Sequence, residues 1–174
     1  MSDAPAAAPA VARSYRFEAV LIAALLVADQ ISKALVRAYI PLHDSVTVIA
    51  GWLHLTHVRN TGAAFGFLNA AEFPYKQVVV ALAATTALVG IALYAARVSS
   101  HDRLARVGLA MILAGAIGNL IDRLWLGSVV DFVDVVLGGW HFWAFNVADS
   151  AITLGVIAMM IDMIGLDRHV STTS

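Results

Sequence analysis

The chain contains no cysteine, and only 13% of its 174 residues are charged. The first absence excludes disulfides, thiolate catalysis and cysteine-ligated metal sites. The charged share is about half the ~25% that is typical of soluble domains. With a net charge of −1 and no basic stripe, nothing indicates a nucleic-acid partner. Hydrophobic residues make up 60% of the chain and the mean hydropathy is +0.81, so most of it is expected to contact lipid.

Four apolar runs divide the sequence. Each is about 20 residues long, which suits a helix that crosses the hydrocarbon core. A helix is required because lipid cannot satisfy exposed backbone polar groups. The runs are residues 17–40, 78–96, 107–126 and 145–164. The first is not interpreted as a cleaved signal peptide, because apolar sequence continues past Asp29 to full spanning length.

The arginines between the runs predict the orientation. Cytoplasmic loops carry the excess of Lys and Arg. Six arginines fall on one side: Arg13, Arg16, Arg97, Arg103, Arg106 and Arg168. The other side carries Arg59, Lys76 and three helix-end residues, Lys33, Arg37 and Arg123. Both termini are therefore predicted to be cytoplasmic, with residues 41–74 and 127–144 outside.

The domain plan follows from these spans. Residues 1–14 are rich in alanine and proline and are expected to be disordered. A transmembrane domain is expected over residues 15–166, followed by a short cytoplasmic tail at 167–174. Within the outer segment 41–74, β-branched and aromatic residues flank Gly51, which predicts a hairpin. We therefore predict an all-α membrane protein of four transmembrane helices, with a small outer β element between the first two.

Polar residues gather near the outer membrane face. They are Asp29, Lys33, Asn60, Asn119, Asp122, Arg123, Asp131, Asn146 and Asp149. Snorkelling at helix ends explains single Lys or Arg residues. Ionisable groups beside hydrocarbon are costly to keep, so a cluster of this size indicates a functional site.

Spacing suggests how some of these residues interact. Asp29 and Lys33 are four apart and share a helix face, so they predict either an ion pair within the bundle or direct chemistry. Asn119 and Arg123 have the same spacing and predict either interhelical hydrogen bonds or contacts to substrate carbonyls. Asn146 is a candidate N-cap for the fourth helix.

Asp131 and Asp149 are the two acids that best fit shared-proton chemistry. Asp131 is expected in an outer loop and Asp149 in the first turns of the fourth helix. Two converging carboxylates share a proton, which suits acid–base catalysis. Asp134 is interpreted as a solvated turn residue. The histidines show no ligand pattern, and neither a metal nor another cofactor is expected.

Five ordered blocks resemble the lipoprotein signal peptidases, the type II signal peptidases of bacteria. The blocks are Asp29–Lys33 (DQISK), Asn60–Gly66 (NTGAAFG), Gly118–Arg123 (GNLIDR), Val129–Val133 (VVDFV) and Phe145–Asp149 (FNVAD). The similarity covers about residues 17–165. One departure lies just before the residues quoted for the third block, where the family usually has two glycines and this chain has Ala114-Gly115. The added methyl group is not expected to change activity.

The resemblance implies a function and a set of roles. Members are intramembrane aspartyl endopeptidases that remove signal peptides from diacylglyceryl-modified prolipoproteins, cleaving just before the lipidated cysteine. Asp131 and Asp149 would be the catalytic pair. Substrate binding or support of the site would fall to Asp29, Lys33, Asn60, Gly115, Asn119, Arg123 and Asn146. The family also implies an outer β-cradle, the inner membrane as location and inhibition by the cyclic peptide globomycin; we expect a monomer.

A small membrane transporter or proton relay is the alternative function. Such proteins also carry Asp, Lys and Asn within their spans. A relay predicts polar residues through the depth of the bilayer, however, and the middles of the last three apolar runs carry none that are charged. A structural subunit is a second alternative, and it predicts that replacing either aspartate has little effect.

Overall fold

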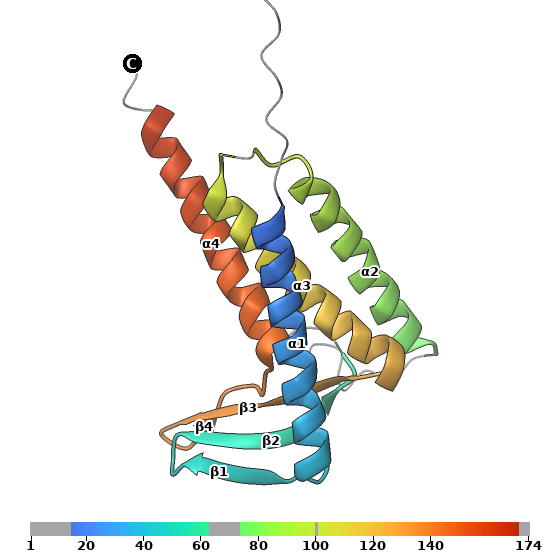
Figure 1. Cartoon of the computed structure of the whole chain (residues 1–174). Coiled ribbons are helices and arrows are strands. Elements are labelled where there is room, and N and C mark those ends of the chain that lie inside the picture. The colour runs from blue at the N-terminus through green and yellow to red at the C-terminus, as the bar shows by residue number, and fades with distance from the viewer. Residues whose placement is uncertain (1–14, 63–73, 100, 171–174) are drawn as a thin grey trace, which may run out of the picture.

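The computed structural model describes residues 15–62, 74–99 and 101–170, with the side chains of 166–170 left out. Four long helices are each apolar enough to cross a membrane (Figure 1). They are α1 (Arg16–Tyr39), α2 (Lys76–Ala95), α3 (Arg103–Leu126) and α4 (Val147–Val170). The four predicted spans are confirmed. Helix α3 begins four residues earlier than expected, and α4 continues past the predicted domain end at residue 166. Residues 1–14 and 171–174, for which a disordered terminus and a tail end are expected, lie outside the described residues.

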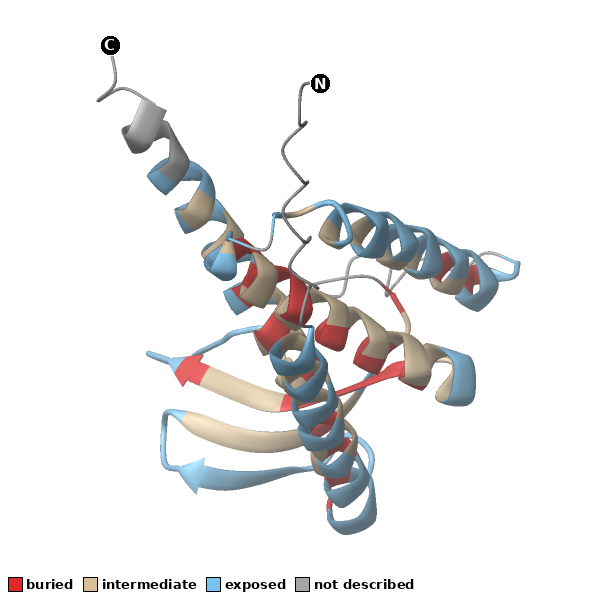
Figure 2. Ribbon diagram, turned by 45° about the horizontal axis from the view of Figure 1, so that its top comes forward, coloured by how far each residue is buried: buried red, intermediate tan, exposed pale blue. Residues whose placement is uncertain are grey.

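Helix α3 is the centre of the bundle and packs against the other three helices. In its most apolar stretch 44% of residues are buried inside the protein, against none in the most apolar stretch of α2. Figure 2 shows this contrast between the two helices. Glycine permits the closest approach: a Cβ on Gly115 would collide with the Ala148 carbonyl group and Ile152 of α4. Small residues thus let α4 lie directly on α3, as is usual between membrane helices.

An antiparallel sheet of four strands closes one end of the bundle (Figure 1). Its strands, in spatial order, are β1 (Ser45–Ile49), β2 (Leu53–Asn60), β3 (Val129–Leu137) and β4 (Trp140–His141). The predicted hairpin around Gly51, whose φ is +74°, is confirmed as β1 and β2. Helix α1 begins and α4 ends at the opposite end of the bundle.

The predicted fold class was incomplete, because half of this sheet comes from the segment between α3 and α4. Asp131 and Asp134 lie on β3 rather than in a loop and a turn. Strand β3 pairs with β2, with Val58 opposite Asp131. Asp131 and Asp134 interrupt the valine-rich run 129–136, and apolar and polar residues do not alternate regularly along it. The sequence of this segment therefore gives no clear signal for a strand. Pairing with β2 decides the strand conformation, as context often does for β-structure.

A small core joins the sheet to the helices. Val36 and Ile40, at the end of α1, are buried together with Val130 and Phe132 of β3. This contact holds the beginning of β3 against the end of α1. The carboxylate of Asp131, between the two core residues of β3, is thereby placed at the junction of sheet and bundle.

Candidate active site

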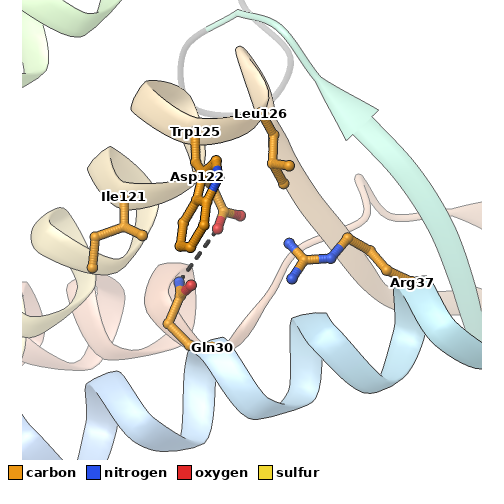
Figure 3. Close-up of a pocket in the computed structure, with 6 residues that line it drawn as sticks. All are labelled: Gln30, Arg37, Ile121, Asp122, Trp125 and Leu126. Carbon is orange, nitrogen blue, oxygen red and sulfur yellow. Dashed lines mark hydrogen bonds between the residues drawn. The ribbon is translucent and has the colours of Figure 1, made fainter.

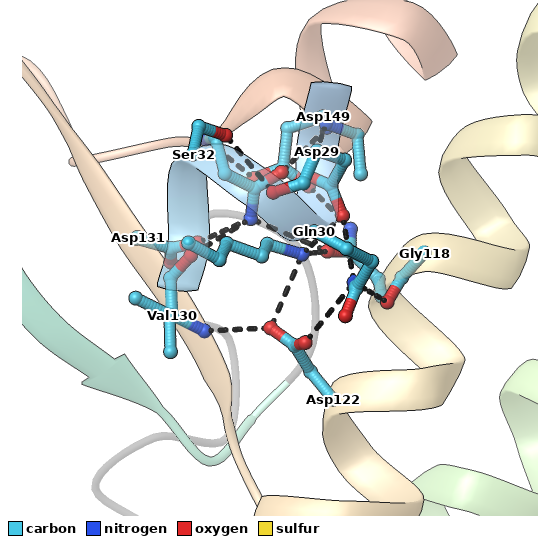
Figure 4. Close-up of polar contacts among 12 residues, drawn as sticks. Asp29, Gln30, Ser32, Gly118, Asp122, Val130, Asp131 and Asp149 are labelled. Atoms are coloured by element: carbon cyan, nitrogen blue, oxygen red, sulfur yellow. Dashed lines mark hydrogen bonds and ion pairs between the residues drawn. The ribbon is translucent and has the colours of Figure 1, made fainter. Parts of the chain in front are cut away.

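Lys33 is the hub of a buried polar network. Figure 4 shows this network, with Asp29, Asp122 and Asp149 among its labelled members. Its side chain is fully buried, and its ammonium nitrogen lies 2.8 Å from Asp29 Oδ2 and 3.1 Å from Asp122 Oδ2. It also donates to Asn119 Oδ1 at 3.0 Å. An ammonium has three donors, and all three are used here. A buried charge is tolerated only when it is paired in this way, so Lys33 joins α1 firmly to α3.

Asp29 extends the network to the fourth helix. Its Oδ1 accepts the backbone N–H of Ala148 at 3.0 Å, in the first turn of α4. On the other side, a Cβ on Gly118 would come within 2.7 Å of Asp29 Oδ2, so glycine is needed for this approach. The predicted Asp29–Lys33 ion pair is confirmed. Its contacts are those of an element that fixes α1, α3 and α4 relative to one another.

Asp122 and Gln30 also belong to the network, although neither was in the predicted set of site residues. Asp122 is 1% exposed, and its Oδ2 accepts the backbone N–H of Val130 at 3.1 Å. Gln30 Nε2 lies 3.3 Å from Asp122 Oδ1 and 3.1 Å from Asp29 Oδ2. Figure 3 shows Gln30 and Asp122 at a cavity of about 120 Å³ beside Arg37 and Trp125. Asp122 therefore ties Lys33 to the residue that precedes Asp131. The sequence signal for Asp122 was an acidic residue directly before Arg123, near the end of an apolar run.

Two asparagines carry the network to the predicted catalytic acids, and their orientation is determined by their neighbours. Lys33 can only donate, so Asn119 must present Oδ1 to it and Nδ2 to Asp149 Oδ1, at 2.8 Å. The backbone N–H of Asp149 donates to Asn146 Oδ1 at 2.9 Å. The amide of Asn146 must therefore point Nδ2 towards Asp131 Oδ1, at 2.7 Å. Asn119 and Asn146 thus each donate a side-chain N–H to a different one of the two acids.

Asp149 lies at the beginning of α4 in a reciprocal cap. Asn146 caps the helix, as predicted, by accepting the Asp149 N–H, while its own N–H lies 3.3 Å from Asp149 Oδ2. This is the geometry of a capping box. The positive end of the helix dipole further favours a negative charge at this position. Asp149 is only partly buried, so it retains access to solvent.

Asp131 has a different environment. It is 3% exposed, and its Oδ2 accepts Asn60 Nδ2 at 3.2 Å. Burial, and next the nearby carboxylate of Asp149, raises the pKa of Asp131 to about 7, although hydrogen bonds from Asn60 and Asn146 act in the opposite direction. At neutral pH, Asp131 is thus poised to hold a proton beside a second carboxylate.

Arg123 completes the cluster on the side of β2. Its guanidinium donates to the backbone carbonyls of Asn119, at 3.2 Å, and Gly62, at 3.1 Å. Gly62 N–H in turn donates to Asn60 Oδ1 at 3.0 Å and so closes a turn directly after β2. Of the predicted site residues, only Gly115 lies outside this polar network, where it has the contact role between α3 and α4 described above.

Asp134 lies apart from the network. It is hydrogen-bonded across the sheet to His141, with Oδ2 2.8 Å from Nδ1. His57 points to the core, where its Nδ1 lies 2.8 Å from the Ile40 carbonyl oxygen. Within residues 15–62, 74–99 and 101–170, no three His, Asp or Glu side chains are grouped as metal ligands.

Known proteins share both the sequence and the fold of this chain. The family described as signal peptidase (SPase) II matches residues 21–165. The lipoprotein signal peptidase of Geobacter metallireducens is 42% identical over 158 residues, covering 91% of this chain and 96% of the relative. That of Geobacillus thermodenitrificans is 42% identical over 143 residues, or 82% and 86%.

Solved structures support the same comparison. A bacterial membrane enzyme solved by the in meso method at 2.3 Å resolution superimposes with a TM-score of 0.77 at 30% identity, covering 91% of this chain and 92% of that one. A second, at 1.9 Å, also gives 0.77, at 28% identity and 84% and 92% coverage.

Proposed function

The chain belongs to the signal peptidase II family, whose members are aspartic-type peptidases, and from this premise we propose that Asp131 and Asp149 are its catalytic pair. The observation that carries the proposal is the position of Asn146. Its side-chain Nδ2 holds Asp131 at 2.7 Å, while its backbone and Oδ1 hold Asp149. One residue therefore sets the separation of two carboxylates that come from a strand and a helix.

Asp149 is proposed to be the base and Asp131 the acid. Asp149 has the helix N-terminus and an amide that Lys33 polarises through Asn119. Hydrogen bonds in such chains strengthen one another. Asp131 has only neutral amide donors and is more deeply buried, which favours its protonated form. Other charges also act on these acids: those of Lys33 and Arg123 on both, and that of Asp29 on Asp149.

The proposed reaction is hydrolysis through a bound water. The Asp149 carboxylate takes a proton from the water, whose oxygen attacks the scissile carbonyl carbon, while Asp131 gives its proton to the carbonyl oxygen. A tetrahedral diol results. Asp149 then protonates the amide nitrogen, the C–N bond breaks, and a diol hydroxyl returns its proton to Asp131. Acid–base assistance contributes about 10²–10⁴-fold to the rate, and positioning adds to it.

The proposed substrate is a prolipoprotein whose cysteine already carries diacylglycerol, cleaved just before that cysteine. The network lies at the sheet end of the bundle, while Arg103 and Arg106 lie at the other end. By the excess of positive charge inside, the termini are cytoplasmic and the site faces the periplasm at the inner membrane surface. Exposed Trp140 and Trp143 suit the same interface. Acyl chains then remain in lipid while the peptide bond reaches the acids, and globomycin is expected to compete for this position.

The experiment is single-turnover cleavage of a lipidated precursor by purified variants. Asp131→Asn and Asp149→Asn should each abolish turnover in folded, membrane-inserted protein. Asp134→Asn, on the same strand as Asp131 but outside the network, is the matched control and should retain substantial activity. Near-normal turnover by either of the first two variants contradicts the catalytic pair. A proton relay, the alternative function, has no reason to cleave the precursor at all.

A further inference from the structure

A cavity of about 410 Å³ lies at the end of the bundle opposite the sheet. Its walls are mainly apolar and come from three helices, with Ala19 and Ile22 of α1, Ala95 of α2, and Leu109 and Leu113 of α3 among the lining residues. Both α1 and α2 pack against α3, but in the described part of the chain they make very few contacts with each other (Figure 1). The protein thus leaves open a space of the size that takes a small molecule or a lipid chain.

The cavity ends in a pair of opposite charges. Glu18 Oε1 lies 2.6 Å from Arg106 Nη2, and these side chains are only 16% and 14% exposed. The Arg106 guanidinium also lies 5.3 Å from the centre of the Tyr15 ring. The second carboxylate oxygen, Glu18 Oε2, is buried and receives no hydrogen bond from any described residue. Leaving such an acceptor unsatisfied is costly, so the site lacks one donor.

We propose that this cavity binds a phospholipid with a primary ammonium headgroup, phosphatidylethanolamine. The ammonium donates to Glu18 Oε2, the phosphate faces the Arg106 guanidinium, and an acyl chain lies along the apolar walls between α1 and α2. A zwitterionic headgroup carries both charges that the pair requires: its ammonium is opposite the Glu18 carboxylate, and its phosphate is opposite the Arg106 guanidinium. A choline headgroup has no N–H to donate, and a glycerol headgroup offers only a neutral hydroxyl. Hydrogen bonds between two charged groups are the stronger kind, so the ammonium is preferred.

The test uses the full chain, delipidated in detergent and supplied with phosphatidylethanolamine, phosphatidylcholine or phosphatidylglycerol of identical acyl chains. Native mass spectrometry measures the retained lipid. We expect the ethanolamine lipid to be retained roughly tenfold better than the choline lipid, as one charge-assisted hydrogen bond predicts. Glu18→Gln should abolish this preference. Asp162→Asn makes the same acid-to-amide change on α4, towards the same end of the bundle but outside the cavity lining, and should keep the preference.

A second variant tests the place of binding. Ala19 is exposed and lines the cavity, so Ala19→Trp should fill it and reduce the retention of the ethanolamine lipid. Glu18→Gln also weakens the pair with Arg106, so the measured quantity is the difference between lipids within each variant. Equal retention of the ethanolamine and choline lipids by the unmodified protein overturns the proposal. So do a preference for the glycerol lipid, and a preference that survives Glu18→Gln.

Discussion

The position of the shared proton can be tested without measuring cleavage. Burial, and next the Asp149 carboxylate, raises the pKa of Asp131 from 3.8 to about 7. At about 1.4 kcal/mol per tenfold change, this corresponds to roughly 4 kcal/mol against ionisation of Asp131. We therefore expect the protein to contain one carboxylic acid that loses its proton close to neutral pH. Its protonated C=O stretch is visible by infrared spectroscopy of the protein in membranes.

Two substitutions identify the group. Asp131→Asn should remove the near-neutral titration, because the titrating group is gone. Asp149→Asn should move it to lower pH, because the neighbouring negative charge no longer opposes ionisation of Asp131. Asp134→Asn, which alters an acid outside the network, should leave the titration unchanged.

The opposite pattern would refute the reasoning: a titration that vanishes in Asp149→Asn and moves to lower pH in Asp131→Asn places the proton on the other acid. Such a result would leave the catalytic pair itself intact, since that depends on the cleavage assay. In the unmodified enzyme, turnover should fall about tenfold per pH unit above about 7, as the acid Asp131 is lost.

The same proton affects stability, and the sign follows from the pKa of Asp131. The folded protein holds this proton more tightly than the unfolded chain. Its contribution is therefore fully present below pH 3.8 and is lost as pH rises through about 7. For this group alone, the free energy of unfolding falls with rising pH across that window.

Three further predictions concern the network, the substrate and the topology. Lys33→Met should lower the free energy of unfolding by about 3–5 kcal/mol, because it leaves two buried carboxylates without their cation. Chemical denaturation measures the change; the control is Arg37→Met, at an exposed position of the same helix, and an equal or smaller effect of Lys33→Met would contradict the prediction. The enzyme should cleave a lipidated precursor faster than the same precursor without diacylglycerol, because each acyl CH₂ in hydrocarbon contributes about 0.8 kcal/mol to anchoring. Equal cleavage rates in the same bilayer would show that the site recognises only the peptide. A cysteine at Ser45 should react with a membrane-impermeant thiol reagent in intact spheroplasts while one at Ser99 does not, and the reverse labelling would invert the proposed topology.

The sequence alone determined the spans and the composition of the site. Runs of about 20 apolar residues have one stable solution in lipid, the helix. Polar residues beside them are costly, so their presence already marked Lys33, Asn119 and Asp149 as candidates for a functional site. The helical spacing of Asp29 and Lys33 made an ion pair one of the two roles predicted for them, because four residues place two side chains on one face.

Only the tertiary structure decided where Asp131 lies and how the acids meet. The strand β3 forms because it pairs with β2. The two segments are about 70 residues apart in the sequence, so a local sequence pattern cannot predict their pairing. The same pairing places Val130 N–H on Asp122 and brings Asp131 to Asn146. The different environments of the two acids then follow from burial on a strand and from a helix N-terminus, both of which exist only in the assembled fold.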